Sequence, residues 1–283
     1  IDSPYEVVGV FTQPDRPKGR GGKVQMSPVK EVALEYGIPV FQPQRIRVDG
    51  LDDLKSLAPD LCVTAAFGQI LSQEILDIPT LGTINVHASL LPKHRGSAPI
   101  NWAILQGDQE AGVTTMMMDV GLDTGDMLLK EKTPIGENET AEELHDRLSA
   151  IGASLIVKTL NELDSIIPTK QDDSLSTYAP MLSKELSAID WNKSATEVHN
   201  LVRGLNSWPM ATSSIDGKIY KIHNTKIASG KGEPGEIISL SPFVVACGEG
   251  AVEIVNIQRE GKKKMPAADF LRGYKLNIGD KFE

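Results

Sequence analysis

The segment from Asn85 to Pro99, NVHASLLPKHRGSAP, holds several side chains suited to chemistry. Asn85 and His87 are two residues apart in a short β pattern, TINVH, so both side chains should point to one face of a strand. Ligands of open α/β sheets bind beyond the carboxyl ends of strands, and this strand ends here. An amide and an imidazole on one face could donate hydrogen bonds to an oxygen that gains negative charge. Taken singly, each residue also has a structural explanation, because Asn often forms turns and His is often buried and hydrogen-bonded.

The residues that follow are unusual for a loop. Apolar side chains are followed at once by basic ones in the run Ser89, Leu90, Leu91, Pro92, Lys93, His94, Arg95. An apolar surface beside cations suits a flat heterocycle that carries an anionic tail. This run is therefore a candidate ligand-binding loop.

A second candidate region is DVGLDTGD, Asp119 to Asp126, between two segments with strand patterns. Its glycines and aspartates are typical of a structural turn. Alternating acids can also bind calcium, but the spacing here does not match an EF-hand loop. Asp123, near the middle, is the carboxylate of interest.

A third region, TQPDRPKGRGGK from Thr12, is basic and rich in glycine; its cations are Arg16, Lys18, Arg20 and Lys23. A phosphate-binding Walker loop would need Ser or Thr after the lysine, and Val24 stands there instead. A mobile loop that touches RNA phosphates fits the composition better, and a solvated surface loop remains the alternative.

The composition restricts the class of protein. The chain has 283 residues, 40% apolar and 24% charged, and no apolar run of about 18 residues, which describes a soluble protein rather than a membrane protein. The five histidines are scattered and predict no metal site. Cys62 and Cys247 lie in apolar runs and should be buried and unpaired. The net charge of −9 is unlike that of most nucleic-acid binders but allows local basic patches.

Strand and helix patterns alternate in residues 1–165, which predicts an α/β domain with a doubly wound, mainly parallel, Rossmann-like sheet. Ser27 followed by Pro28 should begin one helix, and Thr140 with Glu143 another. Periodicity fails over 166–184, which is expected to be a linker. Residues 185–283 begin with a capping box at Ser194 and continue as about five short strands, which predicts an OB-like β-barrel.

Taken together, these stretches resemble the folate-dependent formyltransferase family. The resemblance rests on Asn85-Val86-His87, on SLLP at Ser89 to Pro92, on RGSAP at Arg95 to Pro99, and on GLDTGD at Gly121 to Asp126. The basic segment, the SPVK that follows it and the β-rich second domain are most similar to the branch that formylates methionyl-initiator tRNA. The resemblance covers nearly the whole chain, and its motifs are specific jointly rather than singly.

The resemblance implies a role for each matching residue. Asn85 would donate to the formyl oxygen, His87 would polarise that oxygen, and Asp123 would orient His87 and assist proton removal from the attacking amine. Residues Ser89, Leu90, Leu91 and Pro92 would line the site of 10-formyltetrahydrofolate. Arg16, Lys18, Arg20 and Lys23 would reach the acceptor end of the initiator methionyl-tRNA, which the barrel would also hold. No metal and no covalent enzyme intermediate are expected.

Other functions remain open at this stage. A folate-dependent formyltransferase with a small-molecule amine acceptor would share Asn85, His87 and Asp123 without needing the basic segment or the barrel. A non-catalytic RNA-binding protein would leave those three residues without a role. A nucleotide-dependent dehydrogenase would need Gly-x-Gly-x-x-Gly after its first strand, and no such motif follows the first strand pattern of this sequence.

The chain begins at Ile1, in or just before what the family resemblance makes the second strand. We therefore expect the catalytic domain to lack its first strand and helix in this sequence. A monomer in the bacterial cytoplasm is expected, or in an organelle matrix if the source is eukaryotic.

Overall fold

The computed structural model describes residues 3–18 and 22–283, without the side chains of Lys18 and Lys23. It divides into two compact units that are built from alternating parts of the chain. The first contains Ile1–His87, Val113–Glu131 and Gly152–Ser174, and the second contains Ala88–Gly112, Lys132–Ile151 and Leu175–Glu283. The chain therefore leaves and re-enters each unit, which a reading along the sequence does not reveal.

The strands that form the α/β part are short. They are β1 (Val10–Phe11), β2 (Arg16–Lys18), β3 (Lys23–Gln25), β4 (Val40–Phe41), β5 (Cys62–Thr64), β6 (Thr83–His87), β7 (Arg95–Gly96), β8 (Glu110–Met117), β9 (Met127–Pro134) and β10 (Tyr178–Ala179). The helices between them are α1 (Pro28–Glu35), α2 (Ile46–Asp49), α3 (Leu51–Leu57), α4 (Gln73–Leu76), α5 (Pro99–Leu105) and α6 (Ala141–Glu162).

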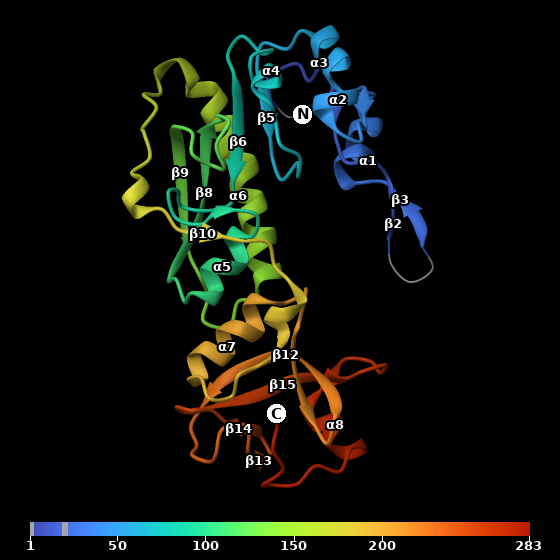
Figure 1. Cartoon of the computed structure of the whole chain (residues 1–283), viewed down its shortest axis with the longest axis vertical. Helices are drawn as coiled ribbons and strands as arrows, with labels where there is room; N and C mark the ends of the chain where they lie inside the picture. The colour runs from blue at the N-terminus through green and yellow to red at the C-terminus, as the bar shows by residue number, and fades with distance from the viewer. Residues whose placement is uncertain (1–2, 19–21) are drawn as a thin grey trace. The chain divides into compact units, whose positions relative to one another are not determined.

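The central sheet has the order β5-β6-β8-β9, and β1 pairs with β4 in a separate ladder. The pairs β1–β4 and β5–β6 are parallel, whereas β6–β8 is antiparallel, so the sheet is mixed. The helix α6 lies against it (Figure 1): the Thr159 hydroxyl is 2.8 Å from that of Thr115 on β8. The expected α/β architecture is confirmed.

Local sequence signals act as expected at the helix starts. Ser27 accepts a hydrogen bond from Lys30 N at the start of α1, and Pro28 occupies the first turn. At α6, the Glu143 carboxylate accepts from Thr140 N, and Thr140 Oγ1 accepts from Glu143 N. These side chains bond the first amide groups of each helix, which have no partner within it.

The remaining elements form the C-terminal domain. They are α7 (Ala195–Gly204), β11 (Ala211–Ile215), β12 (Lys218–Ala228), β13 (Ile237–Leu240), β14 (Phe243–Ala246), β15 (Ala251–Arg259), β16 (Met265–Pro266) and α8 (Ala267–Gly273). The antiparallel sheet runs β11-β12-β15-β14-β13, with β16 on β15.

The barrel is closed by the last residues described. Ser214 of β11 exchanges two backbone hydrogen bonds with Glu283, and Ile237 of β13 donates to Asp280 O. Phe282, 2% exposed, lies in the core with Phe270 of α8 and Val202 of α7. The end segment thus connects the two edge strands, and the prediction of a barrel is confirmed.

Candidate active site

Asn85 and His87 lie on β6, in the middle of the central sheet. The strand pairs in parallel with β5 on one side and antiparallel with β8 on the other, so its backbone is fixed from both edges. His87 is only 6% exposed, while Asn85 is partly exposed. The alternation of a strand puts the two side chains on one face, as the sequence predicted.

The orientation of the Asn85 side chain depends on Thr64, a residue that the sequence did not single out. Thr64 on β5 is the register partner of Asn85, and its hydroxyl donates to Asn85 Oδ1 at 2.9 Å. Because the carboxamide oxygen accepts this bond, the Nδ2 group is the end of Asn85 oriented to donate elsewhere. Register between strands is not readable from one sequence, so Thr64 carried no signal there.

Asp123 lies in the loop between β8 and β9, and two features help to fix this loop. Asp119 Oδ1 accepts from Gly121 N at 3.0 Å and from Thr124 Oγ1 at 2.7 Å. A Cβ on Gly125 would lie 1.8 Å from Met117 O, so no other residue fits there without a backbone shift. Asp123 itself has φ +54°, in the left-handed region that costs a non-glycine residue about 1–2 kcal/mol.

This loop places Asp123 beside His87. The distance from His87 Nδ1 to Asp123 Oδ1 is 3.7 Å, and the two side chains are 7% and 15% exposed. That separation is within ion-pair range and longer than a typical hydrogen bond. Catalytic hydrogen bonds are often long before substrate binds and shorten in the complex. Asp123 is therefore close enough to orient the His87 ring, which is the role that the family resemblance implies for it.

The arrangement has the parts that acyl transfer to an amine requires. Asn85 offers an amide donor, His87 an imidazole, and Asp123 a carboxylate that can accept a proton. Donors aimed at a developing oxyanion are worth about 10²–10³ in rate each. Among the described residues, no group of three or more His, Cys, Asp or Glu side chains is placed to hold a metal ion.

The loop Ser89 to Pro92 directly follows β6 in the chain. Ser89 and Leu91 are 3% and 1% exposed, whereas Leu90 and Pro92 retain accessible surface. Ser89 Oγ donates to Lys93 O at 2.7 Å, which closes the loop on itself. Side-chain contact with a ligand here would come from Leu90 and Pro92, while Ser89 and Leu91 shape the loop.

His94 differs from the surface cation that the run of basic residues suggested. It is 3% exposed, has φ +58°, and its Nε2 lies 2.7 Å from Asp108 Oδ2. Its backbone N–H donates to Thr177 Oγ1 at 2.8 Å. His94 therefore anchors the end of the loop within its unit, and Lys93 is the exposed cation of the run.

The basic segment contains an antiparallel hairpin, β2 paired with β3. Arg16 is exposed on β2, Lys18 and Lys23 are register partners, and Arg20 lies outside the described residues. Lys30 Nζ donates to Asp15 Oδ2 at 2.6 Å at the base of the hairpin. Hydrogen bonds from Lys30 and then Gln42 lower the pKa of Asp15 below its ordinary value.

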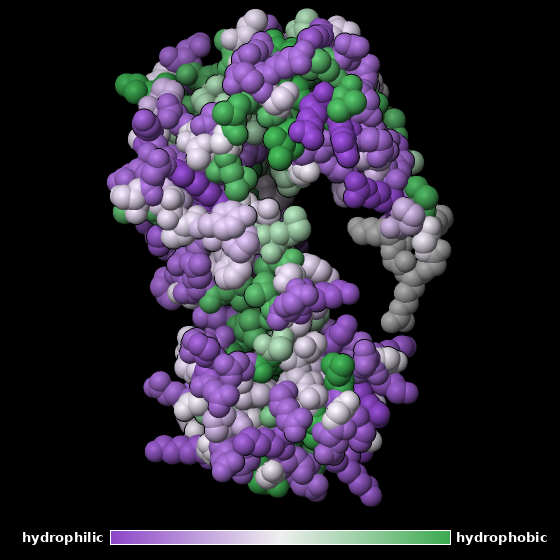
Figure 2. Space-filling view, viewed as in Figure 1, coloured by the Kyte–Doolittle hydropathy of each residue, from purple (hydrophilic) through white to green (hydrophobic). Residues whose placement is uncertain are grey.

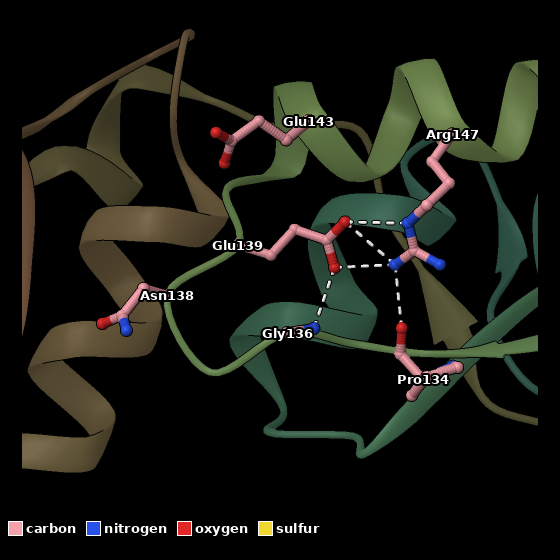
Figure 3. Close-up of a pocket in the computed structure, with 6 residues that line it drawn as sticks. All are labelled: Pro134, Gly136, Asn138, Glu139, Glu143 and Arg147. Carbon is pink, nitrogen blue, oxygen red and sulfur yellow. Dashed lines mark hydrogen bonds and ion pairs between the residues drawn. The ribbon is translucent and has the colours of Figure 1, made fainter.

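A surface hollow is formed around the loop that precedes α6 (Figure 3). Its Glu139 carboxylate accepts from Gly136 N and pairs with Arg147 at 2.7 Å, and Arg147 also donates to Pro134 O. The Glu139 and Arg147 charges in this hollow are therefore paired with each other. We assign it a structural role.

Two findings bear on the expected class. Cys62 and Cys247 are unpaired, and burial raises the pKa of Cys247 to about 11, as expected of a buried thiol. The prediction that Cys62 is also buried is wrong, because its side chain is only partly covered. No helix in the described part of the chain is long and apolar enough to span a membrane.

Sequence comparison identifies the class. A model described as formyl transferase matches residues 2–160, and one described as formyl transferase, C-terminal domain, matches residues 181–275. The chain therefore belongs to the formyl transferase family, and the resemblance stated from its motifs is confirmed.

Close relatives carry one name. The methionyl-tRNA formyltransferase of Citrifermentans bemidjiense is 54% identical over 284 residues, which cover 99% of this chain and 89% of that protein. The methionyl-tRNA formyltransferase of Clostridium novyi is 51% identical over 282 residues, 97% of this chain and 91% of that protein. The similarity thus spans both the α/β part and the barrel.

Solved structures share the fold at lower identity. An N-formyltransferase from Helicobacter canadensis, in complex with folinic acid and dTDP-3-aminofucose, has a TM-score of 0.64 at 21% identity, covering 88% of this chain and 87% of its own. HypX from Aquifex aeolicus, in complex with tetrahydrofolic acid, has a TM-score of 0.64 at 21% identity over 87% of this chain. The match spans 47% of the HypX chain, about half of its length.

Proposed function

We propose that this protein transfers the formyl group of 10-formyltetrahydrofolate to the α-amino group of methionyl-initiator tRNA. The observation that carries the proposal is the approach of Asp123 to His87, whose side chain shares a strand face with Asn85. The chain is also about half identical to bacterial methionyl-tRNA formyltransferases. The product would be the formylmethionyl-tRNA that starts translation.

The reaction assigns a task to each of the three residues. The neutral amine attacks the formyl carbon, the new N–C bond forms, and the carbonyl oxygen becomes an oxyanion. Asn85 Nδ2 and His87 hydrogen-bond that oxygen, which lowers the barrier. Asp123 holds His87 and takes up the proton that the amine loses. The bond to folate N10 then breaks, and N10 receives a proton.

Binding of the two substrates is assigned to separate surfaces. The loop Ser89 to Pro92 would contact the folate, chiefly through Leu90 and Pro92. The hairpin residues Arg16, Lys18, Arg20 and Lys23 would contact phosphates near the acceptor end of the tRNA. The barrel offers the exposed residues Lys262, Lys263 and Lys264, on a domain whose visible face is largely hydrophilic (Figure 2).

The relatives named above are bacterial, which supports a bacterial setting for this reaction. We propose a monomer that works in the bacterial cytoplasm, where initiator tRNA is charged.

We also propose that residues 166–184 form the boundary between the catalytic and tRNA-binding domains. In the structure, this segment is packed rather than extended: Ala179 of β10 is fully buried, and β10 pairs with β7.

The test is a transfer assay. Purified protein is incubated with 10-formyltetrahydrofolate and methionyl-initiator tRNA, and formylmethionine is measured after the ester is hydrolysed. Parallel reactions contain charged elongator methionine tRNA, or an amino-sugar nucleotide as acceptor. Formylation of the initiator tRNA alone supports the proposal. Formylation of the amino sugar would indicate a small-molecule enzyme, and RNA binding without transfer would indicate a non-catalytic protein.

A further inference from the structure

Gln171 lies in the segment that the sequence presents as a linker, yet it is 5% exposed. Its Nε2 group donates two hydrogen bonds, to Asp123 O and to Gly125 O, both at 2.8 Å. A carboxamide nitrogen carries two hydrogens, so each carbonyl can receive one. The Gln171 side chain is therefore hydrogen-bonded to the backbone of the loop at Asp123 and at Gly125.

The backbone conformation of Asp123 requires contacts of this kind to hold it. Asp123 has a left-handed backbone, a conformation that a non-glycine residue holds only when its surroundings impose it. A rotation to ordinary φ would redirect its side chain away from His87. Asp119 secures the side of the loop before Asp123, through Gly121 N and Thr124 Oγ1. Gln171 holds the part of the loop from Asp123 to Gly125 through its two hydrogen bonds.

Gln171 is itself held in place by backbone pairing. Thr169 and Met127 exchange two hydrogen bonds, each 2.8 Å long, in an isolated antiparallel bridge. Met127 begins β9, directly after the Asp123 loop, so the bridge fixes both the Gln171 segment and the end of the loop. Strand β9 therefore positions both the segment that carries Gln171 and the loop that accepts its hydrogen bonds.

We propose that Gln171 is a positioning residue for formyl transfer, which holds Asp123 in the backbone conformation that directs its carboxylate at His87. This inference rests on the proposed function. The side chains closest in shape do not offer the same contact: a glutamate would turn carboxylate oxygens toward two carbonyl oxygens, and a methionine offers no donor. An asparagine has the donors but is one methylene shorter.

The experiment compares Gln171→Met and Gln171→Asn with wild type in the transfer assay. We expect kcat to fall about 10- to 100-fold in Gln171→Met, because a misplaced reacting group costs up to about 10²-fold. The KM values for 10-formyltetrahydrofolate and for the tRNA should stay within about twofold. A smaller loss of kcat is expected for Gln171→Asn.

Thr159→Val provides the matched structural control. Thr159 is fully buried on α6 in the same unit and bonds to Leu155 O and the Thr115 hydroxyl, neither of which belongs to the Asp123 loop. Valine keeps the shape and removes these bonds. We expect its melting temperature to fall about as much as that of Gln171→Met, while its kcat stays within about twofold of wild type.

A double mutant separates positioning from general weakening. In an Asp123→Asn background, where the residual rate no longer depends on the carboxylate, Gln171→Met should lower kcat by less than about twofold. An equal loss in both backgrounds, or wild-type kcat in folded Gln171→Met, would overturn the inference. If Gln171→Met does not fold, Gln171→Asn decides by the same criteria. A wild-type protein that transfers no formyl group would instead refute the proposed function.

Discussion

Replacing Thr64 by valine tests whether the orientation of Asn85 matters for catalysis. Valine has nearly the shape of threonine, so the packing of β5 against β6 should persist, while the hydrogen bond to Asn85 Oδ1 is lost. Without it, the carboxamide can turn over and present its oxygen to the formyl oxygen. That orientation repels the oxyanion instead of stabilising it.

The size of the effect follows from the geometry. The Thr64–Asn85 bond is 2.9 Å long, an ordinary neutral hydrogen bond, with a net value of about 0.5–1.5 kcal/mol. At about 1.4 kcal/mol per tenfold change in rate, Thr64→Val should lower kcat about two- to tenfold. Asn85→Ala removes the donor altogether and should cost about 10²–10³. The Thr64 effect must therefore be the smaller of the two.

The assay is steady-state formyl transfer at saturating folate and tRNA, with Thr64→Ser as the rescue variant. Serine keeps the hydroxyl and loses only a methyl group, so kcat should return to within about twofold of wild type. Equal losses in the serine and valine variants would show that the hydroxyl alone does not account for the effect. A valine variant with wild-type kcat would refute the role given to Asn85 orientation.

Three further outcomes are expected. Asp123→Asn should lower kcat about 10²–10⁴-fold in the transfer assay with the melting temperature little changed, because the carboxylate takes up a proton in the reaction; a near-wild-type rate would contradict the mechanism. Initiator tRNA affinity, measured by filter binding, should weaken steadily as salt rises from 50 to about 200 mM, since basic side chains contact phosphates; an unchanged affinity would exclude that mode. Burial lowers the pKa of His199, so the folded state favours the neutral ring, and the stability that neutral His199 contributes should be lost as the pH falls below about 6.5. Between pH 8 and pH 5.5, the melting temperature should therefore decrease less in His199→Gln than in wild type. Equal decreases in the two proteins would contradict this expectation.

The sequence predicts helix starts and the central strand β6 well, but it does not predict where the other short strands end. Strand β6 was identified in full as TINVH, because its five residues follow a β pattern between turn signals. Helices α6 and α7 start where their capping residues predicted, because a cap is a contact between residues three apart. The apolar runs around Val8 and Val63 are longer than the strands that form within them, β1 and β5, because strand ends are set by pairing with other segments.

Long-range contacts account for what the sequence missed. His94 looked like one of three surface cations, but the partner that makes its burial tolerable, Asp108, lies in a turn after helix α5. Gln171 looked like part of a linker, because its two acceptors are more than forty residues away in the chain. Polar side chains are buried only where partners exist, and a single sequence does not show where distant partners meet.

The sequence alone determined that Asn85 and His87 share a strand face, since side chains of a strand alternate with a period of two. It also determined the glycine-rich loop around Asp123 and the capped helices, since these depend on neighbours in the chain. Only the tertiary structure decided that Asp123 faces His87, that Thr64 orients Asn85, and that Gln171 grips the Asp123 loop. Each of these contacts joins separate segments, and their distances arise from strand register and loop packing rather than from local preference.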